Sequence, residues 1–236
     1  MAFLNILPDP NNKIDNAGIA DNTNGVAGPG FASMTLTSDD KVMMSRTNTG
    51  RVITRKTATQ QWKLKISYNP LTRDEFEPVY NFLLYYGKLR PFYVKLPQHL
   101  TSRNSSIYNN GVIYGGNAAA GAQYVVAGFG SNAESDKPRP GDLFRVAATS
   151  DSLHQKVYRF LRVETRTAGT YEGSAPDTNT ARIWTYPNIL RPIAANQTLR
   201  FVDPQMRVIL DRDVISYSLN TDNLYKFDLQ LTEALA

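Results

Sequence analysis

Cysteine is absent from the 236 residues of this chain, and its absence excludes several kinds of chemistry. Disulfide bonds, nucleophilic thiols and thiolate metal ligands are all ruled out. Histidine is nearly absent as well, because only His99 and His154 occur. Neither belongs to an H-E-x-x-H motif, and no G-x-S-x-G nucleophile elbow is present. The sequence therefore predicts no catalytic residue, no metal site and no cofactor in a protein that is not an enzyme. Both histidines are predicted to lie in loops or on the surface.

Long hydrophobic runs are also missing. No apolar segment approaches the roughly 20 residues that a membrane-spanning helix requires. The first ten residues, MAFLNILPDP, contain a short apolar patch with no positively charged flank, so they do not predict a signal peptide. Hydrophobic residues make up 42% and charged residues 20% of the chain, which is typical of globular proteins. We expect synthesis in the cytoplasm and no membrane association.

Residues of one charge sign are not clustered anywhere along the sequence. Lysine and arginine number 26 against 21 acidic residues, for a net charge of +5. The basic residues alternate along strand-like segments, as at Lys63 and Lys65 or Arg159 and Arg162, and form no dense run. This pattern indicates solvated strand faces rather than a groove for nucleic acid.

The most regular part of the chain spans residues 62–97 and predicts a strand, a helix and a second strand. Apolar and polar residues alternate over 62–68 and again over 92–96, as in strands with one buried face. Between them, apolar residues recur at helical spacing and predict a helix over about residues 72–86. Gly87 suits the left-handed backbone that often follows a helix end. A helix this short needs a sheet to pack against.

The start of this helix has two alternatives in the sequence. Thr72 with Glu75 forms one capping box, and Asp74 with Glu77 forms a second. Pro78 removes a helical donor in the first arrangement, whereas the second places it nearer the tolerated first turn. The sequence leaves both open.

The N-terminal third combines a polar arm with strand-like segments. Residues 1–35 are rich in Asn, Asp, Gly and Ala, and we expect this arm to become ordered only against an adjacent subunit. Strand patterns follow at 34–36, 42–44 and 52–54, separated by turn residues. They predict a meander that leads into the strand beginning at Trp62.

Two kinds of sequence pattern along the chain indicate two domains. The closing segment 225–231 alternates as cleanly as 62–68, whereas 101–204 contains many short strand patterns separated by Asn- and Gly-rich turns. We therefore predict a mainly β protein. A β-sandwich or barrel domain with one packed helix is split between residues 1–100 and 205–236, and 101–204 form an inserted small β-barrel.

A family resemblance rests on the pattern of expected core residues. These are W-x-L-x-I-x-Y over 62–68, L-T-x-x-E-F over 71–76, and the G-K, P-F and L-P pairs within 82–97. Together with the closing strand 225–235, this pattern resembles the distal tail and baseplate-hub proteins of tailed phages. The middle segment, with G-D-L-F over 141–144, K-V-Y-R over 156–159 and L-R-P over 190–192, is similar to barrels inserted in some tail-tip proteins.

The resemblance implies a structural role in assembly without catalysis. Such proteins form rings, most often hexameric, that join the tail tube to the baseplate and contact other baseplate or tail-tip proteins. It further implies a place in the virion tail and a channel through which DNA passes transiently. The core and assembly candidates on this chain are Trp62, Leu64, Phe76, Leu83, Gly87, Phe92, Phe227 and Leu229.

Two other functions follow from the residues alone. A carbohydrate- or receptor-binding β module of a tail tip would use exposed aromatic rings as sugar platforms, with Tyr108, Tyr114, Tyr171 and Trp184 as candidates. Aromatic residues gathered on one open face of the insert would favour it. A nucleic-acid-binding barrel would instead need basic and aromatic residues interleaved on one surface.

Overall fold

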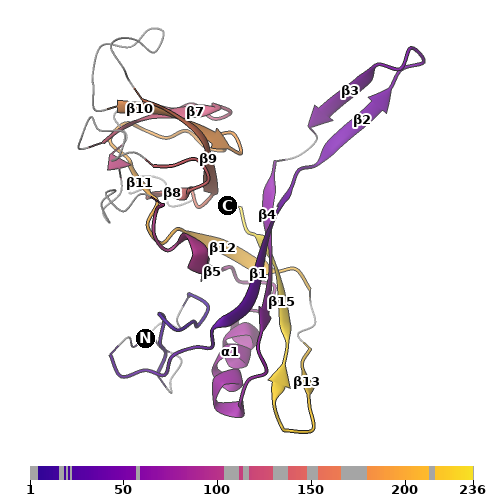
Figure 1. Ribbon diagram of the computed structural model, residues 1–236, viewed down its shortest axis with the longest axis vertical. Coiled ribbons are helices and arrows are strands. Elements are labelled where there is room, and N and C mark those ends of the chain that lie inside the picture. Colours follow the sequence, from indigo (N-terminus) through magenta and orange to yellow (C-terminus); the bar gives the residue numbers. More distant parts are fainter. Residues whose placement is uncertain are drawn as a thin grey trace. The chain divides into compact units, whose positions relative to one another are not determined.

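The computed structural model describes residues 5–15, 19, 21, 23–56, 59–103, 112–113, 117–129, 138–147, 154–165, 180–212 and 216–235. By contacts the chain divides into two compact units (Figure 1). Unit 1 combines Met1–Val94 with Arg207–Ala234, and unit 2 combines Lys95–Met206 with Leu235–Ala236. The protein is mainly β, as predicted. Within the described part of the chain, no helix has the length and apolarity that crossing a bilayer demands.

Unit 1 contains a five-stranded sheet in the order β1-β4-β15-β12-β5 (Figure 1). These strands are β1 (Phe31–Asp39), β4 (Gln61–Tyr68), β15 (Asp228–Glu233), β12 (Gln205–Leu210) and β5 (Phe92–Lys95). β4 pairs antiparallel with β1 and with β15, so that Leu64 lies opposite both Leu36 and Leu231. The two segments with the cleanest alternation are therefore neighbours in the sheet, although more than 150 residues separate them in the chain.

Helix α1 (Arg73–Tyr86) uses the first of the two predicted caps. The Glu75 carboxylate accepts hydrogen bonds from the backbone N–H and the hydroxyl of Thr72, both at 2.9 Å. Pro78 is consequently inside the helix. At the other end, Gly87 adopts a positive φ of 53°, and its N–H donates to the Leu83 carbonyl at 2.7 Å. The positive φ at Gly87 agrees with the left-handed backbone predicted after the helix end.

The core of unit 1 lies between α1 and one face of the sheet. The helix buries Phe76, Val79, Phe82, Leu83 and Tyr86. Each predicted apolar core residue is 3% exposed or less: Trp62, Leu64, Phe76, Leu83, Phe92, Phe227 and Leu229. Their burial accounts for a role in folding, and a role in assembly stays a prediction.

The N-terminal arm packs onto its own unit. The backbone N–H of Leu7 donates to the Tyr93 carbonyl at 2.8 Å, and the N–H of Tyr93 donates to the Asn5 carbonyl at the same distance. Leu7 is 1% exposed and Ile14 is 7% exposed. The expectation that the arm orders only against an adjacent subunit is thus wrong for residues 5–15. The overall polar composition of this stretch gave no sign that two apolar side chains, Leu7 and Ile14, would be buried.

The predicted meander is also wrong. β2 (Val42–Arg46) and β3 (Val52–Lys56) pair with each other and with no other strand of the described chain (Figure 1). The preceding strand, β1, pairs directly with β4 as far as Asp39 opposite Gln61. Residues 42–56 therefore form a separate two-stranded ribbon.

Unit 2 contains a closed barrel of short strands in the order β10-β7-β6-β11-β8-β9. They are β6 (Val112–Ile113), β7 (Tyr124–Gly128), β8 (Leu143–Ala147), β9 (Val157–Thr165), β10 (Thr180–Tyr186) and β11 (Thr198–Arg200). The barrel is filled by apolar residues that include Phe144, Tyr158, Phe160, Ile183, Leu199 and Phe201. Closure removes the exposed sheet edges that so many short strands would otherwise present. A one-turn helix, η1 (Pro97–His99), precedes the barrel.

That the barrel can be removed without unfolding unit 1 remains a prediction. The chain enters and leaves the barrel at adjacent points, because the Asp203 N–H donates to the Leu100 carbonyl at 2.9 Å. We expect that replacing residues 101–204 by a short Gly/Ser linker leaves unit 1 folded, since adjacent ends can be rejoined with little strain. Cooperative thermal unfolding followed by circular dichroism checks this, and a chain without a melting transition contradicts it.

Candidate functional site

The β2–β3 ribbon carries the largest group of exposed apolar side chains on one supersecondary element. Val42, Met43, Met44, Val52 and Ile53, here called the hairpin surface, are between 46% and 67% exposed. Successive residues of a strand point to opposite faces, so Met43 and Met44 make both faces apolar. A two-stranded hairpin is marginal by itself in water, and contiguous exposed apolar surface marks interaction sites. The hairpin surface is suited to being covered by a partner.

The same ribbon is entirely basic in its charged residues. Residues 41–56 contain five lysines and arginines and no acidic residue. Two of the cations are paired at the base, where Lys41 lies 3.0 Å from Asp39 and Lys56 lies 3.2 Å from Asp40. Hydrogen bonds from Lys63 and Lys41 hold the pKa of Asp39 below its usual value. The charges farther along the ribbon give it a positive surface beside its apolar one.

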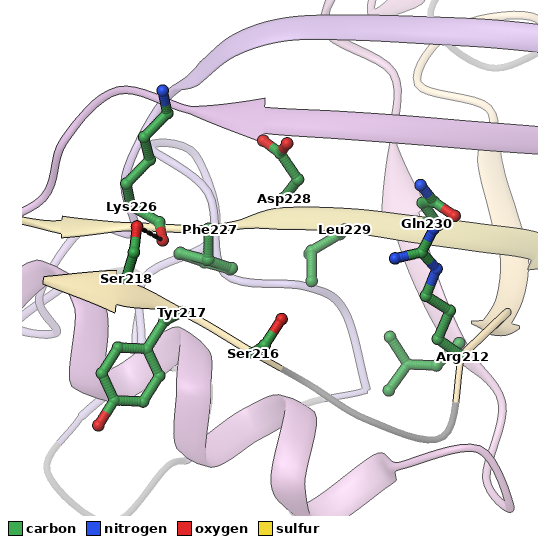
Figure 2. Close-up of a pocket in the computed structure, with 10 residues that line it drawn as sticks. Arg212, Ser216, Tyr217, Ser218, Lys226, Phe227, Asp228, Leu229 and Gln230 are labelled. Atoms are coloured by element: carbon green, nitrogen blue, oxygen red, sulfur yellow. Dashed lines mark hydrogen bonds between the residues drawn. The ribbon is translucent and has the colours of Figure 1, made fainter.

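A pocket of about 460 Å³ opens beside β15 (Figure 2). It lies between the end of β12 and the small hairpin of β13 (Ser218–Leu219) and β14 (Tyr225–Lys226). Seven residue steps separate Asp211 from Ser218, but only four separate their partners Gln230 and Lys226. The two pairings are therefore out of step by three residues, and the pocket is a notch between them.

The residues that line this notch can contact a partner, but they include no nucleophile paired with a base. Figure 2 shows Lys226 and Asp228 on one side of the strand and Tyr217 on the other. The Ser218 hydroxyl donates to the Lys226 carbonyl at 3.5 Å, so it is not paired with a base. No histidine lines the pocket. Among the described residues, no group of three or more His, Cys, Asp or Glu side chains is placed to hold a metal ion.

On the barrel, one predicted sugar platform has an aromatic neighbour. Trp184 on β10 lies directly opposite Tyr124 on β7, with ring centroids 5.3 Å apart. The Arg182 guanidinium lies 4.6 Å from the Tyr124 ring centroid and 3.7 Å from the Glu164 carboxylate. Tyr124 is 39% exposed. The other three candidates, Tyr108, Tyr114 and Tyr171, lie outside the described residues.

His154 precedes β9 and lies outside the strands, as the loop alternative predicted, but it is buried rather than on the surface. It is 2% exposed, and its Nε2 lies 2.8 Å from the Tyr158 hydroxyl. That hydroxyl accepts the backbone N–H of Leu190 at 2.9 Å. His154 thus helps to satisfy polar groups inside the barrel, a role that requires strands distant in sequence to meet.

His99, in η1, is half-buried beside two charged residues. Burial and the positive charge of Arg159 lower the pKa of His99 below 6.5, and Asp142 opposes them. The unfolded chain then binds a proton at a higher pH than the folded chain, so the free energy of unfolding falls as the pH drops below about 6.5. We expect His99→Gln to weaken this loss, as measured by chemical denaturation at pH 7 and pH 5. Equal losses in both proteins would contradict it.

Sequence reasoning missed the hairpin surface because it assigned residues 42–54 to the main sheet. The available signal was the segment 41–56, in which adjacent apolar residues on both faces accompany basic residues only. A strand of a one-sided sheet keeps its apolar residues to one face. Val42, Met43 and Met44 in succession depart from that rule.

Comparisons with known proteins agree with the resemblance in the core pattern. The family described as "Distal tail protein pb9, A domain, N-terminal" matches residues 20–99. The protein "Distal tail protein pb9" of Escherichia phage T5 is 25% identical to this chain over 232 residues. The alignment covers 97% of this chain and 99% of that protein. The similarity thus extends through both units, and the resemblance to tailed-phage distal tail proteins is confirmed.

Proposed function

From this resemblance to the distal tail proteins of tailed phages, we propose that the chain is a structural tail protein that forms a ring. The ring joins the tail tube to the baseplate or tail tip, and the protein has no enzymatic role. Six copies are the expected number. Its partners are further copies of itself, the tube protein and neighbouring tip proteins, and DNA passes through its channel. The relative's name, the exposed ribbon and the absence of a paired nucleophile and base among the residues described above support this.

The single observation that carries the ring is the hairpin surface. Both faces of the β2–β3 ribbon are apolar and exposed, with all five side chains at least 46% accessible. In the proposed ring, the ribbon of one copy contacts a different patch of the next copy, which is a heterologous contact. Heterologous contacts form closed rings when the rotation between copies closes. Covering five such side chains removes enough apolar surface from water to favour association.

Weak, dispersed charge suits the proposed passage of DNA. Lysines and arginines alternate along the strands and form no dense cluster, as at Lys63 and Lys65 of β4. Tight phosphate contacts would retain the genome, whereas scattered ones allow it to move. We place the channel along such strand faces.

The experiment compares the protein with a variant whose hairpin surface is polar. Met43→Ser, Met44→Ser and Ile53→Ser remove the apolar side chains without changing the charge. Leu89→Ser is the matched control, because Leu89 is 96% exposed but lies after α1. We expect the triple variant to lose rings in electron micrographs and to fail to enter tail particles, at an unchanged melting temperature. Rings or incorporation at the level of the control would contradict the proposal.

A second candidate function, glycan binding, is favoured by the aromatic pair on the barrel. Tyr124 and Trp184 form adjacent rings with the polar groups of Arg182 and Glu164 beside them. Stacking on ring faces and hydrogen bonding to hydroxyls together make a sugar site. A glycan array checks this: signals that vanish with Tyr124→Ala and persist with Leu161→Ala would support it. Signals that both variants keep would oppose it.

A further inference from the structure

The entrance to the barrel is held together by a buried carboxylate. Asp142, 3% exposed, accepts the Ser102 hydroxyl at 2.6 Å and the backbone N–H groups of Arg103 and Arg139 at 3.2 Å each. These donors are neutral, so the carboxylate is engaged in fixing the backbone. It ties the segment after η1 to the start of β8.

Two guanidinium groups converge beside this carboxylate, over Gly141. Gly141 has a φ of 101°, and its N–H donates to the Phe160 carbonyl at 2.8 Å. A Cβ at this glycine would lie 3.4 Å from Nη1 of Arg103 and 3.7 Å from Nη2 of Arg159. Both guanidinium groups therefore approach one point of bare backbone.

The arginines are positioned without a carboxylate of their own. Nη1 of Arg103 donates to the Pro140 carbonyl at 2.7 Å, which fixes that guanidinium. Within residues 59–103, 138–147 and 154–165, neither Arg103 nor Arg159 forms an ion pair with an acidic side chain. Burial and, after it, the positive charge of Arg159 lower the pKa of His99, so that His99 lies within electrostatic reach of Arg159 and Asp142.

We propose that Arg103 and Arg159 form a binding site for a phosphate-type oxyanion at the entrance of the barrel, with His99 as a nearby titrating group that senses the bound charge. Guanidinium groups present planar forks of N–H donors that match the oxygens of phosphate. Two of them directed at one point can share such an anion. The anion offsets the repulsion between the two like charges. This site lies in unit 2, separate from the hairpin surface, and does not depend on the proposed ring.

The two histidines of the chain make the test direct. Histidine labelled with 13C in the ring gives two NMR signals, from His99 and His154. Inorganic phosphate is titrated at constant ionic strength made up with chloride. A bound anion favours the charged imidazole, so we expect the titration midpoint of His99 to rise by about one pH unit. Buried His154 serves as the internal reference and should not change.

Three variants identify the residues responsible. Arg159→Gln is expected to abolish the phosphate effect on His99, and Arg159→Lys to weaken it because the fork is lost. Arg103→Gln gives an independent check. Arg200→Gln, at an exposed arginine of β11 on the same barrel, should keep the full effect. A weak site is expected to have a dissociation constant of ~1 mM. If the titration midpoint of His99 is unchanged at a phosphate concentration about 20 times that value, the proposal is overturned. An equal shift in all variants, the mark of general screening, also overturns it.

Discussion

Removal of residues 224–236 is expected to abolish folding of unit 1. β15 pairs with β4 on one side and with β12 on the other, so its loss divides the sheet. Phe227, Leu229 and Leu231 are each 3% exposed or less. Burying each of these side chains contributes about 1.5–3 kcal/mol, which together approaches the whole 5–15 kcal/mol stability of a typical domain.

The deleted strand also contributes a polar contact to the core. The buried Glu233 carboxylate accepts the backbone N–H of Trp62 at 3.1 Å, which joins the end of β15 to the start of β4. Thermal unfolding followed by circular dichroism measures the result. Deleting only Leu235 and Ala236 is the control, because these residues follow the strand. A long deletion that melts cooperatively at the temperature of the control would refute the central position of β15.

The second large effect is expected from Phe76→Ala. The Phe76 ring is 2% exposed and stacks on Tyr225 at 4.4 Å between centroids. It also contacts Phe227 edge-on at 5.3 Å. Truncation leaves a cavity between α1 and residues 225–227, and such changes cost about 3–5 kcal/mol. Tyr85→Ala is the control on the same helix, because Tyr85 is 45% exposed.

Denaturant unfolding with linear extrapolation separates these two variants. Tyr85→Ala, the control, is expected to lower the free energy of unfolding by less than about 1 kcal/mol. The contact that it removes is with the Arg90 guanidinium, which lies 4.8 Å from the centroid of the Tyr85 ring. A difference between the variants below about 1 kcal/mol would contradict the packing of the helix on residues 225–227.

The two proposed surfaces can be tested independently because they lie in different units. The hairpin surface belongs to residues 42–53 of unit 1, and the oxyanion site belongs to residues 99–159 of unit 2. Arg159→Gln should therefore leave ring formation unchanged, and Met43→Ser should leave the phosphate effect on His99 unchanged. Effects of the two substitutions are expected to add, since the two surfaces have no residue in common.

Local patterns in the sequence were sufficient for the elements of unit 1. The strand at 62–68, the strand from Phe92 and the helix ending before Gly87 were all predicted close to their observed bounds. Each depends on side-chain periodicity, a cap or a glycine within a few residues. Such signals act over short distances along the chain and can be recognised without knowledge of the rest. The mainly β class follows from them.

Tertiary structure decided which of these elements meet. Alternation alone does not distinguish a strand inside a sheet from the β2–β3 ribbon, because the pattern says nothing about what covers the apolar residues. Likewise, no local signal could bury His154 or bring Arg103 and Arg159 to one glycine. These arrangements depend on contacts between separate segments of the chain, such as Leu190 with Tyr158 and Ser102 with Asp142. Strand pairing and barrel closure determine those contacts, and no single segment of the chain specifies which strands pair.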